Sequence, residues 1–178
     1  MSDFSIAILP LLKHEGGWVD DPNDSGGETA WGISMKWIQS QGLQPQDLDL
    51  PDFDPGCLHA LTLDKAKELY RKYFWDPNKY DQLSDQRVAN KIFDMCVNMG
   101  AHQAHLLAQR ACVSCNHSTV IDGILGPNSI ATINSIKPEE FIAALILKQR
   151  AFYYSLAAKN PKLQVFLGGW LKRSSWAG

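Results

Sequence analysis

Apolar residues recur every three to four positions along most of this chain, and that period restricts its fold more than any other feature. Such spacing places the apolar side chains on one face of a helix, whereas a half-buried strand requires strict alternation. We therefore expect an all-α, helical fold of seven or eight helices, with at most a minor β-hairpin near residues 19–34. The periodic runs cover residues 3–15, 31–41, 62–74, 84–99, 104–112, 127–136 and 138–159, and a short basic helix precedes Gly168–Gly169–Trp170.

Residues with specific roles at helix ends support these boundaries. Asp3, Thr62 and Ser84 stand where an N-cap belongs. Pro127 falls in a first helical turn, where its missing N–H has no cost. Pro138 opens the longest helix and is followed by two acids at its positive end.

The composition excludes several classes of protein. The chain has 178 residues, 45% of them hydrophobic, and a net charge of −2, so nothing global indicates nucleic-acid binding. No stretch approaches the ~18 consecutive apolar residues of a membrane span, and we expect no membrane insertion. Residues 1–60 carry ten acids and two basic residues, whereas residues 141–178 carry six basic residues and no acid.

The N-terminal residues do not follow the pattern of a signal peptide. Asp3 and Pro10 interrupt the apolar run that such a peptide requires. We therefore expect synthesis in the cytoplasm, so that any role outside needs a separate route of delivery.

The four cysteines do not predict a metal site. Cys112 and Cys115, followed by His117, have the spacing of half a zinc site. A structural zinc needs four ligands, and no second pair exists, because Cys57 and Cys96 stand alone. We expect free thiols and no metal.

The stretch KHEGGWVDDPNDSGGETAWGIS, residues 13–34, breaks the helical pattern and holds five carboxylates. Glu15 stands where the first helix is expected to end, and the negative end of the helix dipole raises the pKa of a carboxyl there. A general acid requires this property. The other acids of the stretch offer a second, ionised carboxylate: Asp20, Asp21, Asp24 and Glu28.

Two carboxylates in different environments are the usual equipment for cleaving a glycosidic bond. From these residues alone, a solvated acidic turn is an equally good interpretation. A calcium loop is not, because residues 20–24 lack the alternating ligand spacing of such loops.

The segment HEGGWVDDPNDSGGETAWGIS closely resembles the signature of glycoside hydrolase family 108 N-acetylmuramidases, a group of phage-endolysin-like enzymes and secretion-activator proteins. FDMCVNMG, IDGILGPNSIATIN and FLGGWLKR resemble the family's C-terminal peptidoglycan-binding segment. The resemblance implies a lysozyme-like fold with a catalytic region at residues 1–92. A helical peptidoglycan-binding region at residues 93–178 is expected to pack on it.

The resemblance also implies an activity, hydrolysis of the β-1,4 bond between N-acetylmuramic acid and N-acetylglucosamine, without metal or organic cofactor. Glu15 falls on the family's catalytic acid. Asp24 and Thr29 fit the broader phage-lysozyme pattern, with one residue fewer between them, and are expected to stabilise the transition state and orient water.

Three further residues are candidates for binding the glycan strand. Trp31 can stack on a sugar or anchor the core, and Asn98 can bond substrate or end its helix. Asp21 lies close to Asp24 in the sequence and is the third candidate.

Two alternatives to a muramidase remain open. A lytic transglycosylase uses a single Glu and forms an anhydro-sugar, and a wall-binding accessory of a secretion system needs no hydrolytic activity. For each, the partner is peptidoglycan. We expect the protein to act in the periplasm or at the cell wall, after delivery by a holin or a dedicated export machinery.

Overall fold

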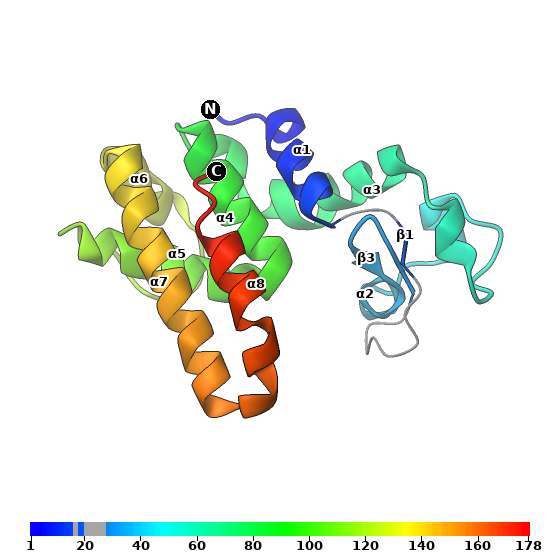
Figure 1. The fold of residues 1–178 in the computed structure, drawn as a ribbon. Coiled ribbons are helices and arrows are strands. Elements are labelled where there is room, and N and C mark those ends of the chain that lie inside the picture. The colour runs from blue at the N-terminus through cyan, green and yellow to red at the C-terminus, as the bar shows by residue number, and fades with distance from the viewer. Residues whose placement is uncertain (16–17, 20–27) are drawn as a thin grey trace. The chain divides into compact units, whose positions relative to one another are not determined.

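The computed structural model describes residues 1–15, 18–19 and 28–178 and confirms the all-α, lysozyme-like prediction (Figure 1). Among these residues the α-helices are α1 (Phe4–Glu15), α2 (Met35–Ser40), α3 (Leu63–Tyr70), α4 (Gln86–Met99), α5 (Ala101–Ser114), α6 (Pro127–Ser135), α7 (Pro138–Lys159) and α8 (Gln164–Ser174). Arg71–Trp75 is a short π-helical segment that continues α3. Five short 3₁₀ helices occur between the α-helices: Pro45–Leu48, Cys57–Ala60, Asp76–Asn78, Tyr80–Gln82 and Pro161–Leu163.

Most of the expected helix starts are confirmed. The Asp3 carboxylate accepts a hydrogen bond from Ser5 N at 2.7 Å, and Thr62 accepts one from Lys65 N. At α4 the cap is Asp85 rather than Ser84, because the Asp85 carboxylate accepts from the first free N–H groups of the helix, those of Arg87 and Val88.

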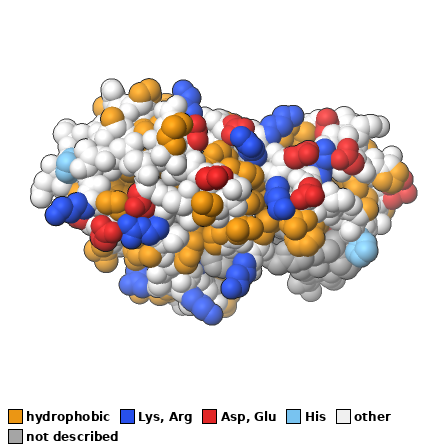
Figure 2. All heavy atoms as spheres, turned by 90° about the horizontal axis from the view of Figure 1, so that it is seen from above, with side chains coloured by type: hydrophobic (Ala, Val, Ile, Leu, Met, Phe, Trp, Pro, Cys, Tyr) orange, Lys and Arg blue, Asp and Glu red, His pale blue; other side chains and the backbone are white. Residues whose placement is uncertain are grey.

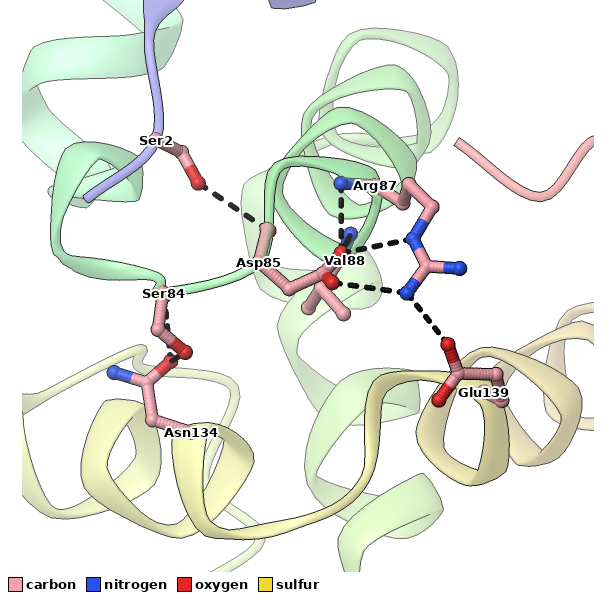
Figure 3. Close-up of polar contacts among 7 residues, drawn as sticks. All are labelled: Ser2, Ser84, Asp85, Arg87, Val88, Asn134 and Glu139. Atoms are coloured by element: carbon pink, nitrogen blue, oxygen red, sulfur yellow. Dashed lines mark hydrogen bonds and ion pairs between the residues drawn. The ribbon is translucent and has the colours of Figure 1, made fainter.

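Ser84 has another role, shown in Figure 3. Its backbone N–H and its hydroxyl both donate to Asn134 Oδ1 of α6, at 2.9 and 3.2 Å. Arg87 extends from the first turn of α4 to Glu139 of α7, with Nη2 and the carboxylate 2.7 Å apart. The start of α4 is therefore tied to both α6 and α7.

Three local expectations are corrected. The predicted helix at residues 31–41 begins only at Met35, since Ser34 is its N-cap and Ile33–Ser34 is a strand. Residues 42–60, where no periodic run predicts a helix, contain two 3₁₀ turns that bury Leu48 and Leu58. The last helix continues through Gly168–Gly169–Trp170 to Ser174 instead of stopping before them.

The chain divides into two compact units. Residues 1–7 and 74–178 form one, called here the bundle unit, and residues 8–73 form the other, the sheet unit. The division predicted after residue 92 falls inside α4 and stays a prediction about the two functional regions.

The bundle unit is a set of helices around an apolar core. α7 packs against α5, α4 and α8, and Figure 1 shows α8 returning antiparallel along α7. Four aromatic rings pack edge to face in its core, with centroids 5.3–6.1 Å apart: Phe4, Trp75, Tyr80 and Phe93. Such geometry sets the positive ring edge against the negative ring face.

The sheet unit contains a three-stranded antiparallel sheet of order β1-β2-β3, formed by Trp18–Val19, Thr29–Ala30 and Ile33–Ser34. Val19 pairs with Thr29, and Ala30 pairs with Ile33. Ala30 and Ile33 are buried, so one face of β2 and β3 belongs to the core.

Among the residues that the structure describes, no helix is both long and apolar enough to cross a bilayer. On the face drawn in Figure 2, acidic and basic side chains are interspersed, and no broad patch of one sign is present there.

Candidate functional site

Glu15 is the last residue of α1, as expected from the sequence. The structure describes its backbone position but not its side chain. Asp21 and Asp24, like Asp20, lie outside the described residues. What the structure describes of this region is the backbone of α1 and the sheet that follows it.

Thr29 lies on β2, the central strand of the sheet. It alternates with the buried Ala30, so its side chain, which is half-buried, belongs to the opposite face. Ser34 is its cross-strand partner on β3, and neighbouring side chains at such positions lie on the same face. That face carries two hydroxyl groups, of which Ser34 Oγ accepts from Trp37 N as the cap of α2.

The pairing of β1 with β2 limits the distance between Thr29 and the end of α1. Val19 pairs with Thr29 and lies four positions after Glu15 in the sequence. Four residues span at most about 14 Å when fully extended. Paired Cα atoms lie about 5 Å apart. The Cα atoms of Glu15 and Thr29 are thus at most about 20 Å apart.

Trp31 occupies an unusual backbone position in the β2–β3 turn. Trp31 and Gly32 have φ of 53° and 80°, the two positive values that a type I′ hairpin turn requires. Glycine adopts this conformation at little cost, whereas a bulky residue there is strained. The strain is opposed by two hydrogen bonds of 2.9 Å, from Trp31 Nε1 to Leu61 O and from the Tyr70 hydroxyl to Trp31 O.

These bonds limit the contacts that Trp31 can make with a substrate. Its indole N–H is used within the protein, so the half-buried ring can offer a substrate only its faces and edges. Trp31 therefore anchors the hairpin, and its stacking on a sugar stays a prediction.

Glu28 has a structural task that the sequence did not reveal. Its two carboxylate oxygens accept from Gly56 N at 3.1 Å and His59 N at 3.2 Å, at the start of the 3₁₀ turn Cys57–Ala60. Its carbonyl oxygen accepts from Met35 N. Glu28 therefore ties the sheet to the following loop, and Asp20, Asp21 and Asp24 are left as candidates for the second carboxylate.

Asn98 belongs to the bundle unit, near the end of α4. Its side chain is exposed, and its Oδ1 accepts a 2.8 Å hydrogen bond from the Tyr153 hydroxyl of α7. Tyr153 is buried, and burial raises the pKa of its phenol. Tyr153 was not among the residues singled out from the sequence, because it lies 55 positions from Asn98 and only the packing of α4 on α7 joins them.

All four cysteines are free thiols, of which Cys96, Cys112 and Cys115 are buried and Cys57 is half-buried. Burial raises the pKa of Cys112 to about 12, so the neutral thiol predominates at neutral pH. Cys115 is also buried, and its Sγ contacts Glu140 O. Within the described part of the chain, no group of three or more His, Cys, Asp or Glu side chains is arranged to hold a metal ion.

Arg173 of α8 forms an ion pair within the bundle unit. Its guanidinium donates to both carboxylate oxygens of Asp94, at 2.9–3.2 Å, and only 1% of the Asp94 side chain is exposed. The residue belongs to a buried ion pair between α8 and α4.

Two parts of the chain match known protein families. Residues 8–100, more than half of the chain, match the family described as glycosyl hydrolase 108, and residues 103–175 match a predicted peptidoglycan domain. Among solved structures, the chain is similar to SagA of Brucella abortus, with a TM-score of 0.76 and 25% identity over 97% of this chain and 89% of that one. Among curated proteins, none matches.

Proposed function

Since the chain belongs to the glycosyl hydrolase 108 family and its second half matches a predicted peptidoglycan domain, we propose that it is an N-acetylmuramidase. It hydrolyses the β-1,4 bond between N-acetylmuramic acid and N-acetylglucosamine in peptidoglycan. One observation carries the proposal, which is the position of Glu15 as the last residue of α1.

Glu15 acts as the general acid. The last carbonyl groups of a helix form the negative end of its dipole, which favours the neutral carboxylic acid over the carboxylate. A neutral acid can protonate the leaving glycosidic oxygen as the bond breaks.

The second carboxylate stabilises the positive charge that develops on the sugar in the transition state. Asp24 is the first choice for this role, since Glu28 is engaged with two backbone N–H groups. A fixed carboxylate stabilises an oxocarbenium-like transition state or positions the attacking water. Thr29, on the half-buried face of β2, orients that water.

Three residues bind the glycan. Trp31 presents the exposed part of its ring, held by Leu61 and Tyr70. Asp21 contacts the substrate beside Asp24, and Asn98 offers an amide from the bundle unit.

Acid catalysis with water as the nucleophile uses protons and water alone, so we propose no metal or organic cofactor. The substrate lies outside the cytoplasmic membrane. Delivery to the periplasm or wall, through a holin-type pore or a dedicated export machinery, is part of the proposal.

The proposal is tested with Glu15→Gln and Asp24→Asn variants on purified sacculi. General acid catalysis contributes roughly 10²–10⁴-fold, so Glu15→Gln is expected to slow clearing by at least about 100-fold while circular dichroism stays unchanged. Asp24→Asn has a comparable effect if Asp24 is the essential second carboxylate and a smaller one if it only positions water. Clearing by a folded Glu15→Gln protein at near wild-type rate contradicts the mechanism.

The products separate the proposed reaction from the alternatives. Mass analysis of released muropeptides is expected to show reducing N-acetylmuramic acid ends. Anhydro ends would identify a lytic transglycosylase, and binding to sacculi without any release would identify a non-enzymatic accessory.

A further inference from the structure

A groove of about 290 Å³ opens on the bundle unit where α4, α7 and α8 meet. This volume lies at the small end of ligand pockets, which run from about 300 to 1,000 Å³, and suits a single sugar ring better than a long segment. Its lining consists of Asn98, Met99, Phe152, Tyr153, Leu156 and Trp170. None of these side chains carries a formal charge at neutral pH, so the groove favours a neutral ligand.

A buried relay of hydrogen bonds sets the orientation of the Asn98 amide. Gln149, which is fully buried, donates from Nε2 to the Tyr153 hydroxyl at 3.1 Å. That hydroxyl uses its own proton to donate to Asn98 Oδ1 at 2.8 Å. Because Oδ1 is the atom engaged, the amide nitrogen of Asn98 is the donor available to the groove. Within the described part of the chain, no protein group accepts from it.

The apolar side of the groove is aromatic. The Trp170 ring stacks on Tyr153, with centroids 5.2 Å apart and planes at 23°. Phe166, one turn earlier on α8, stacks on Trp170 at 5.9 Å and 28° and is 55% exposed. Phe152 leans against Tyr153 on α7. An aromatic surface held this firmly costs little conformational entropy when a ligand binds.

An amide donor beside an apolar, aromatic surface matches one class of ligand. The C–H face of a pyranose is apolar and packs on aromatic rings, while the carbonyl oxygen of an acetamido group accepts a hydrogen bond from an amide. N-acetylmuramic acid adds a lactyl group that carries a carboxylate or the stem peptide, and the uncharged groove has no cation for that carboxylate. N-acetylglucosamine fits without such a group.

We propose that this groove is a binding subsite for an N-acetylglucosamine unit of the glycan, with Asn98 bonding the acetamido carbonyl and Trp170 and Phe152 packing on the ring. The inference rests on the proposed peptidoglycan substrate and names the sugar that this part of the chain binds. Asn98 lies in the segment that matches the hydrolase family, whereas Trp170 and Phe152 lie in the segment that matches the peptidoglycan domain. One subsite is therefore built by both segments.

The test is a titration of the full chain carrying Glu15→Gln, which prevents turnover, with chitotriose followed by ¹⁵N NMR. The side-chain amide of Asn98 and the indole N–H of Trp170 are expected to shift and saturate together. Asn98→Asp keeps an acceptor for the Tyr153 hydroxyl but removes the amide donor. Since a lost hydrogen bond that leaves a polar group unpaired costs about 1–3 kcal/mol, affinity is expected to fall about 5- to 150-fold.

Two controls show that the effect belongs to the groove. Tyr154→Ala removes an exposed aromatic ring from the neighbouring position on α7, outside the lining, and is expected to bind chitotriose like the parent. Cellotriose, which lacks acetamido groups, is expected to bind weakly and equally to the parent and to Asn98→Asp. Trp170→Phe keeps a stacked ring with a smaller surface and is expected to weaken binding of both sugars.

The subsite is disproved if the Asn98 and Trp170 signals do not respond, or if Asn98→Asp binds chitotriose as tightly as the parent. Release of muropeptides by the wild-type chain is measured separately. Release without groove-dependent binding overturns only the subsite, and groove-dependent binding without release overturns only the muramidase proposal.

Discussion

Lys91 places a positive charge in the interior of the bundle unit. Its side chain is fully buried, and its Nζ donates to Ser174 O at 2.9 Å. Burial lowers the pKa of Lys91 to about 8, opposed by the attraction of Asp94 and reinforced by Arg173 and Arg150. The folded protein therefore holds this proton less tightly than the unfolded chain does.

This difference predicts how stability changes with pH. Between about pH 8 and 10.5, the unfolded chain keeps the Lys91 proton and the folded protein releases it, so raising the pH favours folding. A fall from 10.5 to about 8 corresponds to about 3 kcal/mol. Lys91→Met is expected to be more stable than wild type at pH 7 and to lose most of that advantage by pH 10.

Urea unfolding of both proteins at several pH values measures this difference. The comparison cancels the other titrating groups, such as Cys96, whose pKa burial raises to about 11 and which acts in the opposite direction. A stability difference that does not change between pH 7 and pH 10 contradicts the prediction.

At the scale of elements, the ion pair between Asp94 and Arg173 joins α8 to α4. α8 begins without a side-chain cap and contains Gly168 and Gly169, two poor helix formers. Packing on α7 and the bond to Asp94 compensate for these weaknesses. The helix therefore depends on its tertiary contacts more than on its own sequence.

Removing Arg173 from this pair is expected to lower the free energy of unfolding strongly. Arg173→Met leaves the Asp94 carboxylate buried without its guanidinium, and removing one partner of a buried pair costs about 3–5 kcal/mol. The double variant Asp94→Asn with Arg173→Met is expected to recover part of that loss. Thermal unfolding of the single and double variants measures the coupling energy.

Arg110→Met is the matched control, since Arg110 is exposed on α5 and its loss is expected to change stability by less than about 0.5 kcal/mol. Equal stability of Arg173→Met and Arg110→Met would show that the ion pair contributes nothing.

At the scale of the whole molecule, the charge asymmetry in the sequence is smaller than the residue counts indicate. Two of the six basic residues near the C-terminus are engaged internally, Arg173 with Asp94 and Arg150 with Ser174 and Ser175. Lys159, Lys162 and Lys172 are exposed. These three lysines are the exposed cations of the basic segment, whereas Lys148 is half-buried.

Binding to sacculi is therefore expected to depend on salt. Exposed charges are screened beyond ~8 Å at physiological ionic strength, so high salt is expected to weaken binding. Replacing Lys159, Lys162 and Lys172 by Glu is expected to weaken binding at low salt and to remove most of its salt dependence. Sedimentation of the protein with purified sacculi at two salt concentrations measures both effects, and unchanged binding of the variant refutes this role.

The helical class followed from the sequence because helix formation is governed by neighbours three and four positions apart. The apolar period, the caps at Asp3 and Thr62 and the proline in the first turn of α6 are all local signals, and each predicted an element that the structure contains. The end of the first helical pattern similarly predicted Glu15 as the last residue of α1.

Contacts between distant residues were decided only by the tertiary structure. The start of α2 was misjudged because Trp31 joins a hairpin turn held by Leu61 and Tyr70, 30 and 39 positions away. The buried pair of Arg173 with Asp94 and the relay to Asn98 also join residues 55 or more positions apart. No local pattern encodes such contacts, since they form only when helices pack and water leaves the space between them.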